Sequence, residues 1–526
     1  MAKPDKADQN TAYQLKAVID VGSTSIRMVV AEVRKDGTFQ TLDTLNQNVA
    51  IGSDTFTRGR ISRSTIIDAV KVIRNFSSVL KEYGIDVDKE VRAVATSAVR
   101  EARNREEFID RIYMSTGINI EVVEGTEVSR LTFLAIQPVL EANAILRKDR
   151  LLVVEIGGGS TELLGLDQAR VSFAHTYRMG SFRLRETMNE HERSEARQHE
   201  VLRVEIESGV RQCHDAVPKD GVKHSLLLMG GEARFAATAL LKGWNETSLA
   251  EIKVADLSKL ADHILKMDLE KVMRKYHVTA EDAHTLAPAL QAYVKVAEAF
   301  CVKRVYVCSV SLRDGLLTEA ATGASWSEDF VEQILHSVRE VGRRYQQNQA
   351  HADGVTEIAR TLFHALEPEH RLGYRYEVIL TVAAQLHDVG MFIGSSSHHK
   401  HGQYIIENSD IFGMGEEDIH LASLVARYHR GASPRLTHSG YDVLTREQRM
   451  VVNKLSALLR AADAFDRSHN QAIRNVTVVV KENEVVVEVP KPGDFSAEKR
   501  ALVSKGKLFE QVYGRTIILR SRRGQR

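Results

Sequence analysis

The sequence contains few cysteines and no long apolar run, and these absences exclude several classes of protein. Its 526 residues include only Cys213, Cys301 and Cys308. They form no C-x-x-C pair, so neither a disulfide framework nor a thiolate zinc site is expected. The longest apolar stretches, such as residues 151–154, are far shorter than the ~20 residues of a membrane-spanning helix, and the first ten residues hold no apolar signal core. We therefore expect a cytoplasmic protein without a membrane partner.

An excess of one charge is also missing. Lys and Arg total 71 against 70 for Asp and Glu, so the formal net charge is +1. A near-neutral chain argues against a protein that coats nucleic acid, and we expect no nucleic-acid partner. Hydrophobic residues make up 43% of the chain, as in ordinary globular proteins. At roughly 150 residues per domain, the length predicts three or four domains.

Hydrophobic patterning divides the chain into three regions. Up to about residue 321, short apolar strands alternate with amphipathic helices, which predicts an α/β fold. From about residue 325 to 470, apolar residues recur at helical spacing and the segment should be all-helical. The remainder reads as a small α+β module. The expected strands are 17–19, 28–33, 91–95, 151–156, 226–229, 305–308, 476–480, 485–489 and 515–519, and the expected helices include 66–83, 128–140 and 497–512.

Three loops that follow apolar strands are rich in glycine or hydroxyl residues, namely 20–27, 155–162 and 230–234. Successive backbone N–H groups in such loops can turn toward one anion, and Arg27 adds a fork for phosphate oxygens. Neither G-x-x-x-x-G-K-[ST] nor G-x-G-x-x-G occurs, so P-loop and Rossmann folds are not favoured. The first two loops indicate two similar lobes, each of which contributes one loop to a phosphate in a shared cleft.

This arrangement is similar to that of actin, heat-shock ATPases and sugar kinases, and further motifs narrow the resemblance. Residues 20–27, 95–100, 157–162 and 310–317 occur in the order and spacing of the exopolyphosphatase/guanosine pentaphosphate phosphatase (Ppx/GppA) family. The similarity continues through residues 408–410 and 427–430. The resemblance implies two actin-like, ribonuclease H-like α/β lobes, an all-α HD-like domain and a small α+β module, at residues 12–136, 137–323, 325–471 and 472–526.

The resemblance also implies an activity, hydrolysis of a terminal phosphoanhydride bond. The substrate would be inorganic polyphosphate or guanosine pentaphosphate, with Mg²⁺ or another divalent cation, in a homodimer. Such chemistry requires charge stabilisation of the transferred phosphoryl group and an oriented water. Asp20 and Glu162 would hold the metal or order this water. By position, the phosphate-binding residues would be Asp20, Gly22, Ser23, Thr24, Ser25, Arg27, Arg100, Gly157, Gly158, Gly159, Ser160 and Thr161.

Two departures from the family pattern concern catalysis. The second loop opens with Glu155 where the family usually has Asp, and Val128 occupies the position of the family's catalytic Glu. The adjacent Glu127 points ~100° away on a helix, so it serves as base only if the helix start is rotated. The catalytic candidates are therefore Glu127, Glu155 and Glu162. A cleft that binds phosphate without cleaving it is the remaining alternative.

Histidines concentrate in the helical region, where eleven of the 20 lie between His351 and His469. The sequence His387-Asp388 ends an apolar helix, and with its partners it resembles the H…HD…D signature of HD phosphohydrolases. Mixed nitrogen and carboxylate ligands suit Mn, Fe, Zn or Mg. The implied ligands are His351, His387, Asp388 and Asp463, with His401 and His429 where two-metal members place further ligands.

Three hypotheses follow for the whole chain. The first is an exopolyphosphatase-type phosphatase that works in the N-terminal cleft. The second is a metal-dependent HD phosphohydrolase whose cleft senses phosphate or guanosine tetra- or pentaphosphate. The third is a binding protein for these nucleotides without activity. We favour the first, and the C-terminal module suggests no chemistry of its own.

Overall fold

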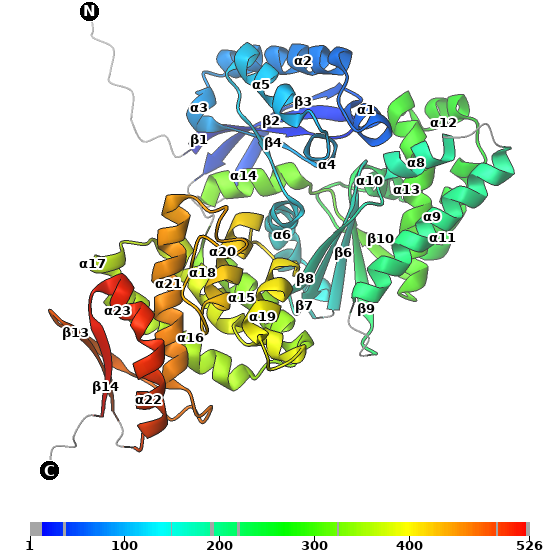
Figure 1. Cartoon of the computed structure of the whole chain (residues 1–526). Coiled ribbons are helices and arrows are strands. Elements are labelled where there is room, and N and C mark those ends of the chain that lie inside the picture. Colours follow the sequence, from blue (N-terminus) through cyan, green and yellow to red (C-terminus); the bar gives the residue numbers. More distant parts are fainter. Residues whose placement is uncertain are drawn as a thin grey trace, which may run out of the picture. The chain divides into compact units, whose positions relative to one another are not determined.

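The computed structural model describes residues 13–34, 38–148, 150–189, 194–217, 221–322, 326–490 and 493–521. The chain forms two compact units, Met1–Ser325 and Trp326–Arg526 (Figure 1). Within the described ranges, no helix is both long and apolar enough to cross a bilayer.

The first lobe of unit 1 is built on a five-stranded sheet in the order β3-β2-β1-β4-β5. Three antiparallel strands form a meander, and two parallel strands extend it beyond β1. Both faces are apolar: Ile19 and Val21 pack in one core, while Val18 packs in another. The strands are β1 (Tyr13–Val21), β2 (Ser25–Arg34), β3 (Phe39–Asn48), β4 (Val91–Ala95) and β5 (Ile120–Val122).

Helices cover both faces of this sheet. Residues of α2 and α5 fill the core on one side, and residues of α6 and α14 fill the core on the other (Figure 1). Ser62 caps α2 by accepting a hydrogen bond from the Thr65 N–H, which fixes where that helix begins. The helices are α1 (Ile51–Arg58), α2 (Arg63–Glu82), α3 (Val87–Glu90), α4 (Ser97–Arg100), α5 (Arg105–Thr116), α6 (Gly125–Ala142) and α7 (Ala144–Lys148).

The second lobe repeats the pattern on a six-stranded sheet in the order β10-β11-β9-β6-β7-β8. An antiparallel meander, β6-β7-β8, is again followed by a strand parallel to its first member. The strands are β6 (Arg150–Ile156), β7 (Thr161–Asp167), β8 (Arg170–Tyr177), β9 (His224–Met229), β10 (Ala250–Lys253) and β11 (Arg304–Val307). The helices are α8 (Ser181–Asn189), α9 (Glu195–Ala216), α10 (Gly231–Leu240), α11 (Val254–Leu265), α12 (Leu269–Tyr276), α13 (Ala280–Ala299) and α14 (Leu312–Thr322).

The repeated meander agrees with the predicted pair of α/β lobes, but the predicted lobe boundary needs correction. The division between residues 136 and 137 falls inside α6, whose Leu131 and Leu134 belong to the first lobe's core. Helix α14 follows the second lobe in sequence, yet its Leu312 and Leu316 pack in that same core. Apolar positions on both helices bury more surface against the first sheet, so no single residue separates the lobes.

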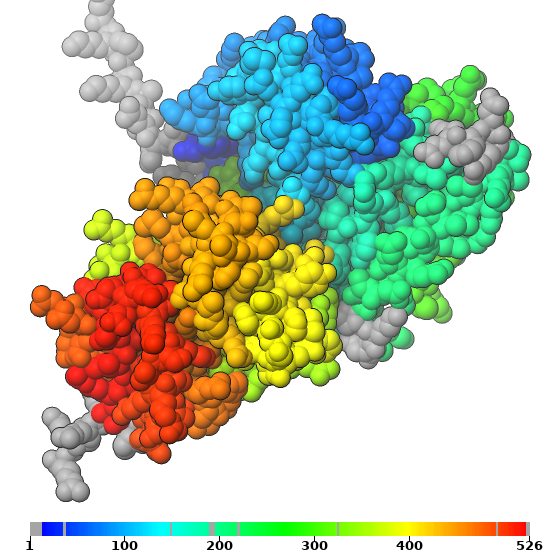
Figure 2. Space-filling model, in the orientation of Figure 1, coloured from blue at the N-terminus to red at the C-terminus, as the bar shows by residue number. Residues whose placement is uncertain are grey.

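The second unit (yellow-green to red in Figure 2) consists of helices and, toward the C-terminus, a small three-stranded sheet, β12-β13-β14. The predicted helix 497–512 is two helices, because it is broken at Gly506. The helices are α15 (Glu328–Arg344), α16 (Gln349–Ala365), α17 (Glu367–His370), α18 (Tyr374–Leu386), α19 (His398–Glu407), α20 (Glu416–Arg427), α21 (Arg446–Phe465), α22 (Ser496–Lys505) and α23 (Lys507–Tyr513), with a 3₁₀ turn η1 (Val389–Phe392). The strands are β12 (Thr477–Val480), β13 (Glu484–Val489) and β14 (Thr516–Ser521).

Candidate functional site

The two predicted phosphate loops are built alike. In the β1–β2 turn the Gly22 N–H donates to the Ser25 carbonyl at 3.0 Å, and in the β6–β7 turn the Gly157 N–H donates to the Ser160 carbonyl at 2.9 Å. Each turn therefore places a glycine and hydroxyl residues at the tip of a hairpin, one from each lobe.

The two loops lie close to each other. A β-carbon on Gly158 would lie 2.9 Å from the β-carbon of Ser23, and one on Gly159 would lie 2.4 Å from the Ser97 hydroxyl. Only glycine permits so close an approach of backbones. The structure thus brings Ser23, Gly158 and Gly159 together from the two lobes.

Thr161 differs from the other predicted loop residues. It is completely buried, and its hydroxyl donates to the Met179 carbonyl. Because β7 has already begun at this residue, its hydroxyl is turned into the second lobe, and the predicted role of Thr161 in phosphate binding stays a prediction that this hydroxyl does not support. Gly22, Thr24, Ser25, Gly157 and Ser160 remain part of the turns.

A cluster of opposite charges lies beside the loops. Arg27 is the cross-strand partner of Asp20, and Arg313 donates to Asp20 Oδ2 at 3.1 Å. Burial lowers the pKa of Arg27, while Asp20 opposes this shift. The members that interact electrostatically are Asp20, Arg27, Glu155, Glu232, Arg234 and Arg313.

Two carboxyl groups of the second lobe have raised pKa values. Glu155 and Glu162 are cross-strand partners on β6 and β7, so their side chains share one face of the sheet. Burial raises the pKa of Glu155, although Arg234 opposes this. Burial also raises the pKa of Glu162 to about 7, against hydrogen bonds from Thr176 and Ser160. A carboxyl group that titrates near neutral pH is suited to general base catalysis.

Glu127 is not available as the base. Arg130 Nε contacts its Oε2 at 2.7 Å and Arg92 Nη2 contacts its Oε1 at 3.1 Å. Burial alone would raise the pKa of Glu127, but the two arginines outweigh it and lower the pKa. Val128 is buried in the first lobe's core. The ion pairs hold both carboxylate oxygens of Glu127 and therefore oppose its predicted role as the catalytic base.

Arg100 contacts the residues just before α6. Its Nη1 donates to the Val123 carbonyl at 2.6 Å, and its Nε lies 3.8 Å from Glu124 Oε2. It also lowers the pKa of Glu162, as one of the weaker influences. Glu124 is therefore a further carboxylate near the cleft that sequence reasoning missed.

The third glycine loop also supplies residues to the site, although only its pattern was recognised in the sequence. Gly230 has φ = 104°, and a β-carbon there would lie 3.3 Å from the Tyr293 hydroxyl, so glycine is required. Helix α10 begins directly after it and carries Glu232 and Arg234 into the charge cluster. In the sequence, the signal that could have identified these site residues is a strand followed by Gly-Gly and then by a helix that carries Glu232 and Arg234.

A second candidate site lies within the helical unit, where imidazole rings face one another in pairs. His351 Nε2 lies 3.3 Å from His387 Nε2, and His398 Nε2 lies 3.3 Å from His429 Nε2. The Nδ1 atoms of three of these rings lie 2.7–3.0 Å from backbone carbonyls, and His351 Nδ1 lies 2.7 Å from Asp466 Oδ2. Since these partners only accept hydrogen bonds, each Nδ1 donates to its partner and each ring turns its Nε2 inward.

The separation within each pair fits a shared metal ion. Two nitrogens that each lie ~2.0–2.1 Å from one tetrahedral ion stand roughly 3.3 Å apart. Asp388 lies between the pairs: its Oδ1 is 3.3 Å from His398 Nε2, and its Oδ2 is 3.8 Å from His387 Nε2. Asp463 Oδ1 lies 3.7 Å from His351 Nε2. The side chains therefore form two adjoining ligand groups without shared members, His351–His387–Asp463 and Asp388–His398–His429, and a third set, His351–Asp388–His469, overlaps both.

Protonation in this cluster differs between the two groups. Burial lowers the pKa of His429 to about 3, which keeps this ring neutral. Burial also acts to lower the pKa of His351, but the hydrogen-bonded Asp463 and Asp466 outweigh this effect and raise the pKa to about 9. A metal ion at the first group would displace that proton.

His401 is not part of the cluster, and His398 lies in its place. His398 is the first residue of α19 and is buried against His429. Three residues later the helix has advanced ~4.5 Å and rotated, so His401 lies outside both ligand groups. The implied ligands His351, His387, Asp388, Asp463 and His429 are brought together.

Comparison with solved structures supports the two-lobed fold. A Ppx/GppA family member from Aquifex aeolicus superposes on this chain with a TM-score of 0.50 at 21% identity. The match covers 60% of this chain and 100% of the Aquifex chain. An exopolyphosphatase from Cytophaga hutchinsonii covers 59% of this chain and 98% of its own, with a TM-score of 0.52 at 20% identity. The predicted fold class is confirmed; the likeness of the helical domain to HD proteins stays a prediction.

Sequence comparison extends over nearly the whole chain. Proteins named guanosine-5'-triphosphate,3'-diphosphate pyrophosphatase are 22% identical in Photobacterium profundum and 24% identical in Aeromonas salmonicida. These matches cover 92% and 91% of this chain and 93% and 92% of the relatives. The model of the Ppx/GppA phosphatase family matches residues 29–323, and that of Ppx/GppA phosphatase domain III matches residues 335–505. The chain belongs to the Ppx/GppA phosphatase family.

Proposed function

We propose that this chain hydrolyses the terminal phosphoanhydride bond of guanosine pentaphosphate or inorganic polyphosphate in the cleft of its first unit. The observation that carries the proposal is Glu162, a buried carboxylate with a pKa of about 7 directly after a glycine loop. The names of the relatives supply the two substrates. The predicted cytoplasmic location and homodimer stay predictions, of which light scattering tests the second.

The residues divide the chemistry between them. Backbone N–H groups of the two loops, with Arg27 and Arg100, bind the oxygens of the terminal phosphoryl group. Glu162 accepts a proton from the attacking water, while Ser160 and Thr176 hold its carboxylate. Asp20, Glu155 and Glu232 offer the oxygen ligands that Mg²⁺ prefers, and such an ion would neutralise charge on the leaving phosphate. The missing family Glu at Val128 is thus replaced by a base from the opposite lobe.

Substitution of Glu162 tests this proposal. Glu162→Gln keeps the shape and the hydrogen-bonding capacity but cannot accept the proton, so kcat should fall about 10²- to 10⁴-fold with little change in KM. Phosphate release from both substrates with Mg²⁺ measures this. Glu127→Gln is the matched control and should retain kcat. A Glu162→Gln enzyme with wild-type kcat would place the base elsewhere.

A specific observation favours a second candidate function for the helical unit. The two pairs of facing Nε2 atoms, with Asp388 between them, support binding of two divalent ions such as Mn²⁺, Fe²⁺ or Zn²⁺. When bound, paired metals activate water and stabilise the oxygens of a phosphate ester during hydrolysis. The Nδ1 partners of the rings, Asp466 and three carbonyls, hold the ligands in position for this role.

Metal analysis tests this second function without an activity assay. We expect about two equivalents of Mn²⁺ or Zn²⁺ per chain in the wild type and about one in His398→Ala. His401→Ala is the matched control, since it removes a neighbouring histidine outside the ligand groups, and should keep both. Equal metal content in all three proteins would disprove the assignment.

A further inference from the structure

The C-terminal module is fixed to the helix that carries one of the candidate metal ligands. Glu498 on α22 is buried and accepts a hydrogen bond from the Ser468 N–H at 3.2 Å, just beyond α21. The Tyr513 hydroxyl donates to the Lys454 carbonyl of α21 at 3.3 Å. Links from both helices of the module therefore set its position within the second unit.

Lys505 extends from this module into the metal cluster. It is the last residue of α22, and its ammonium group pairs with Asp463 Oδ2. The two side chains are 17% and 8% exposed, so little water separates or screens them. The other oxygen of the same carboxylate faces His351. Asp463 is therefore shared between the ligand group and a lysine from a different domain element.

The balance of charge in the cluster shows what a lysine at this position would bind. The two ligand groups contain two carboxylates, Asp388 and Asp463. Two divalent ions would exceed that charge, and Arg430 Nη1 adds another cation within 3.3 Å of both ring nitrogens of His398. With metals in place, Asp463 no longer needs a cationic partner. An ammonium group beside a positively charged metal centre then requires an anion.

We propose that Lys505 binds the phosphate group of the substrate at the metal centre, so that the C-terminal module completes a second active site. This inference rests on the second function proposed above. In the structure Lys505 pairs with Asp463, and a metal ion held by that carboxylate would leave the ammonium group for the phosphate of the substrate. An ammonium group is a compact donor of this kind for phosphate oxygens.

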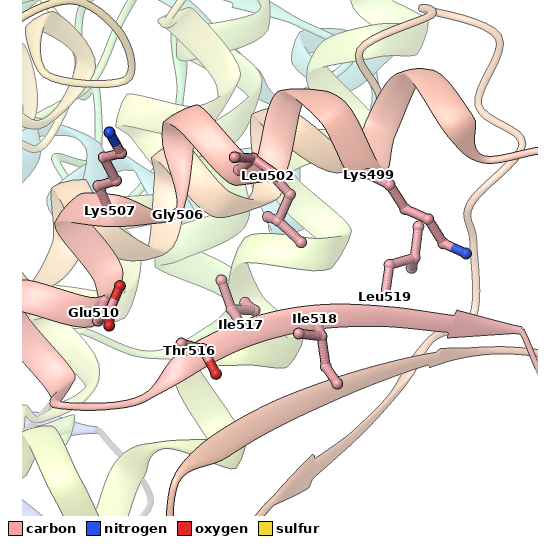
Figure 3. A pocket seen from close by; sticks show the side chains of 10 residues that line it. Lys499, Leu502, Gly506, Lys507, Glu510, Thr516, Ile517, Ile518 and Leu519 are labelled. Carbon is pink, nitrogen blue, oxygen red and sulfur yellow. The ribbon is translucent and has the colours of Figure 1, made fainter.

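A second lysine of the module provides a matched control. Lys507 is exposed and lines a separate groove of about 360 Å³ between the module's helices and β14, with Leu502, Ile517 and Leu519 on its walls (Figure 3). It has the same charge and lies two residues from Lys505. Lys507→Met therefore removes a charge from the module without removing it from the metal centre.

The test measures phosphate binding at the metal centre directly. The full chain is loaded with Co²⁺, whose visible absorption reports its ligands, and inorganic phosphate is titrated in; His387→Ala defines the signal that does not arise from the cluster. We expect Lys505→Met to weaken phosphate binding about 10- to 100-fold with cobalt content unchanged. Lys505→Arg should restore most of the affinity, and Lys507→Met should behave as the wild type.

Each other outcome overturns the inference in a distinguishable way. Wild-type phosphate affinity in cobalt-loaded Lys505→Met would leave the metal centre standing and remove Lys505 from it. Loss of cobalt from Lys505→Met would show that the lysine holds the ligands rather than the substrate. A cobalt spectrum that His387→Ala does not change would disprove the metal centre itself, and with it the role of Lys505.

Discussion

At the scale of single residues, the cleft shows how environment replaces a missing catalytic group. Val128 cannot accept a proton, and Glu127 is held by Arg92 and Arg130. Glu162 lies opposite Glu155 on a neighbouring strand, and burial makes its ionisation unfavourable. The same residue type therefore yields an ion-pair partner at one position and a neutral-pH base at another.

The pH dependence of activity should report this base. Glu162 acts in its ionised form, so kcat/KM should fall about tenfold per pH unit below pH 7 and level off above it. Rates of phosphate release measured from pH 5 to 9 give this acidic limb of the pH–rate profile. A limb centred near pH 4.5, the ordinary value for Glu, would contradict the assignment.

Stability should change in the opposite direction with pH. The folded-state pKa of Glu162 is above its unfolded value, so the native state binds the extra proton between about pH 4.5 and 7. The stability that this proton contributes is present below pH 4.5 and is lost as the pH rises through 7. Glu162→Gln should therefore melt above the wild type at pH 8 in EDTA, by an amount that disappears near pH 5.

The sequence was sufficient for residues whose position depends on local pattern. Gly22 and Gly157 follow apolar strands, so their turns were predictable. The choice between His398 and His401 was not, because it depends on where α19 begins relative to His429. The ion pairs of Glu127 depend on Arg92, which is 35 residues away in sequence.

At the scale of elements, β4, α6 and α14 are joined by a network of partly buried charges. Arg92 on β4 and Arg130 on α6 both pair with Glu319 on α14 and with Glu127. Two arginines and two glutamates alternate, so each charge has partners on other elements. This network fixes α14, which follows the second lobe in sequence, to the first lobe's sheet.

Removal of one member should weaken the fold without altering catalysis. Glu127→Gln leaves the nearly buried Arg130 with one carboxylate fewer, and we expect a loss of about 1–3 kcal/mol in unfolding free energy. Urea denaturation measures the loss of unfolding free energy. The fall of kcat/KM below pH 7 should remain at the same pH. If this fall of kcat/KM moved to another pH in Glu127→Gln, Glu127 would take part in catalysis.

Element boundaries show a similar limit of sequence reasoning. The strands at 91–95 and 151–156 were predicted with their observed ends or within one residue of them, since each is a short apolar run after a polar segment. The break at Gly506 was missed because the residues on both sides keep a helical spacing. A β-carbon there would lie 2.7 Å from the Leu502 carbonyl, so the close packing of that turn requires glycine.

At the scale of the whole molecule, the two candidate sites lie in different compact units. The phosphate loops and Glu162 belong to the first unit, and the histidine cluster with Lys505 belongs to the second. Ligands specific to one site should therefore stabilise one unit.

Calorimetry of the full chain should show this separation. At about 100 times its dissociation constant a metal ion adds ~2.7 kcal/mol, which should raise the melting transition of the second unit by roughly 5–10 °C. With Zn²⁺ and no substrate, the melting temperature of the first unit should stay within about 1 °C of its value without the metal. His387→Ala should abolish the shift. A shift of both transitions in that variant would show that the metal acts elsewhere.

The close contact between Ser23 and Gly158 has a kinetic consequence. A phosphoryl group that binds between Ser23 and Gly158 would require the lobes to part before substrate enters and to close again around it. Opening would then precede every turnover, and in many enzymes such a motion is slower than bond cleavage. An enzyme that removes terminal phosphates from a long chain would release each orthophosphate by the same route, so the rate at which the lobes separate would limit how fast the chain is degraded.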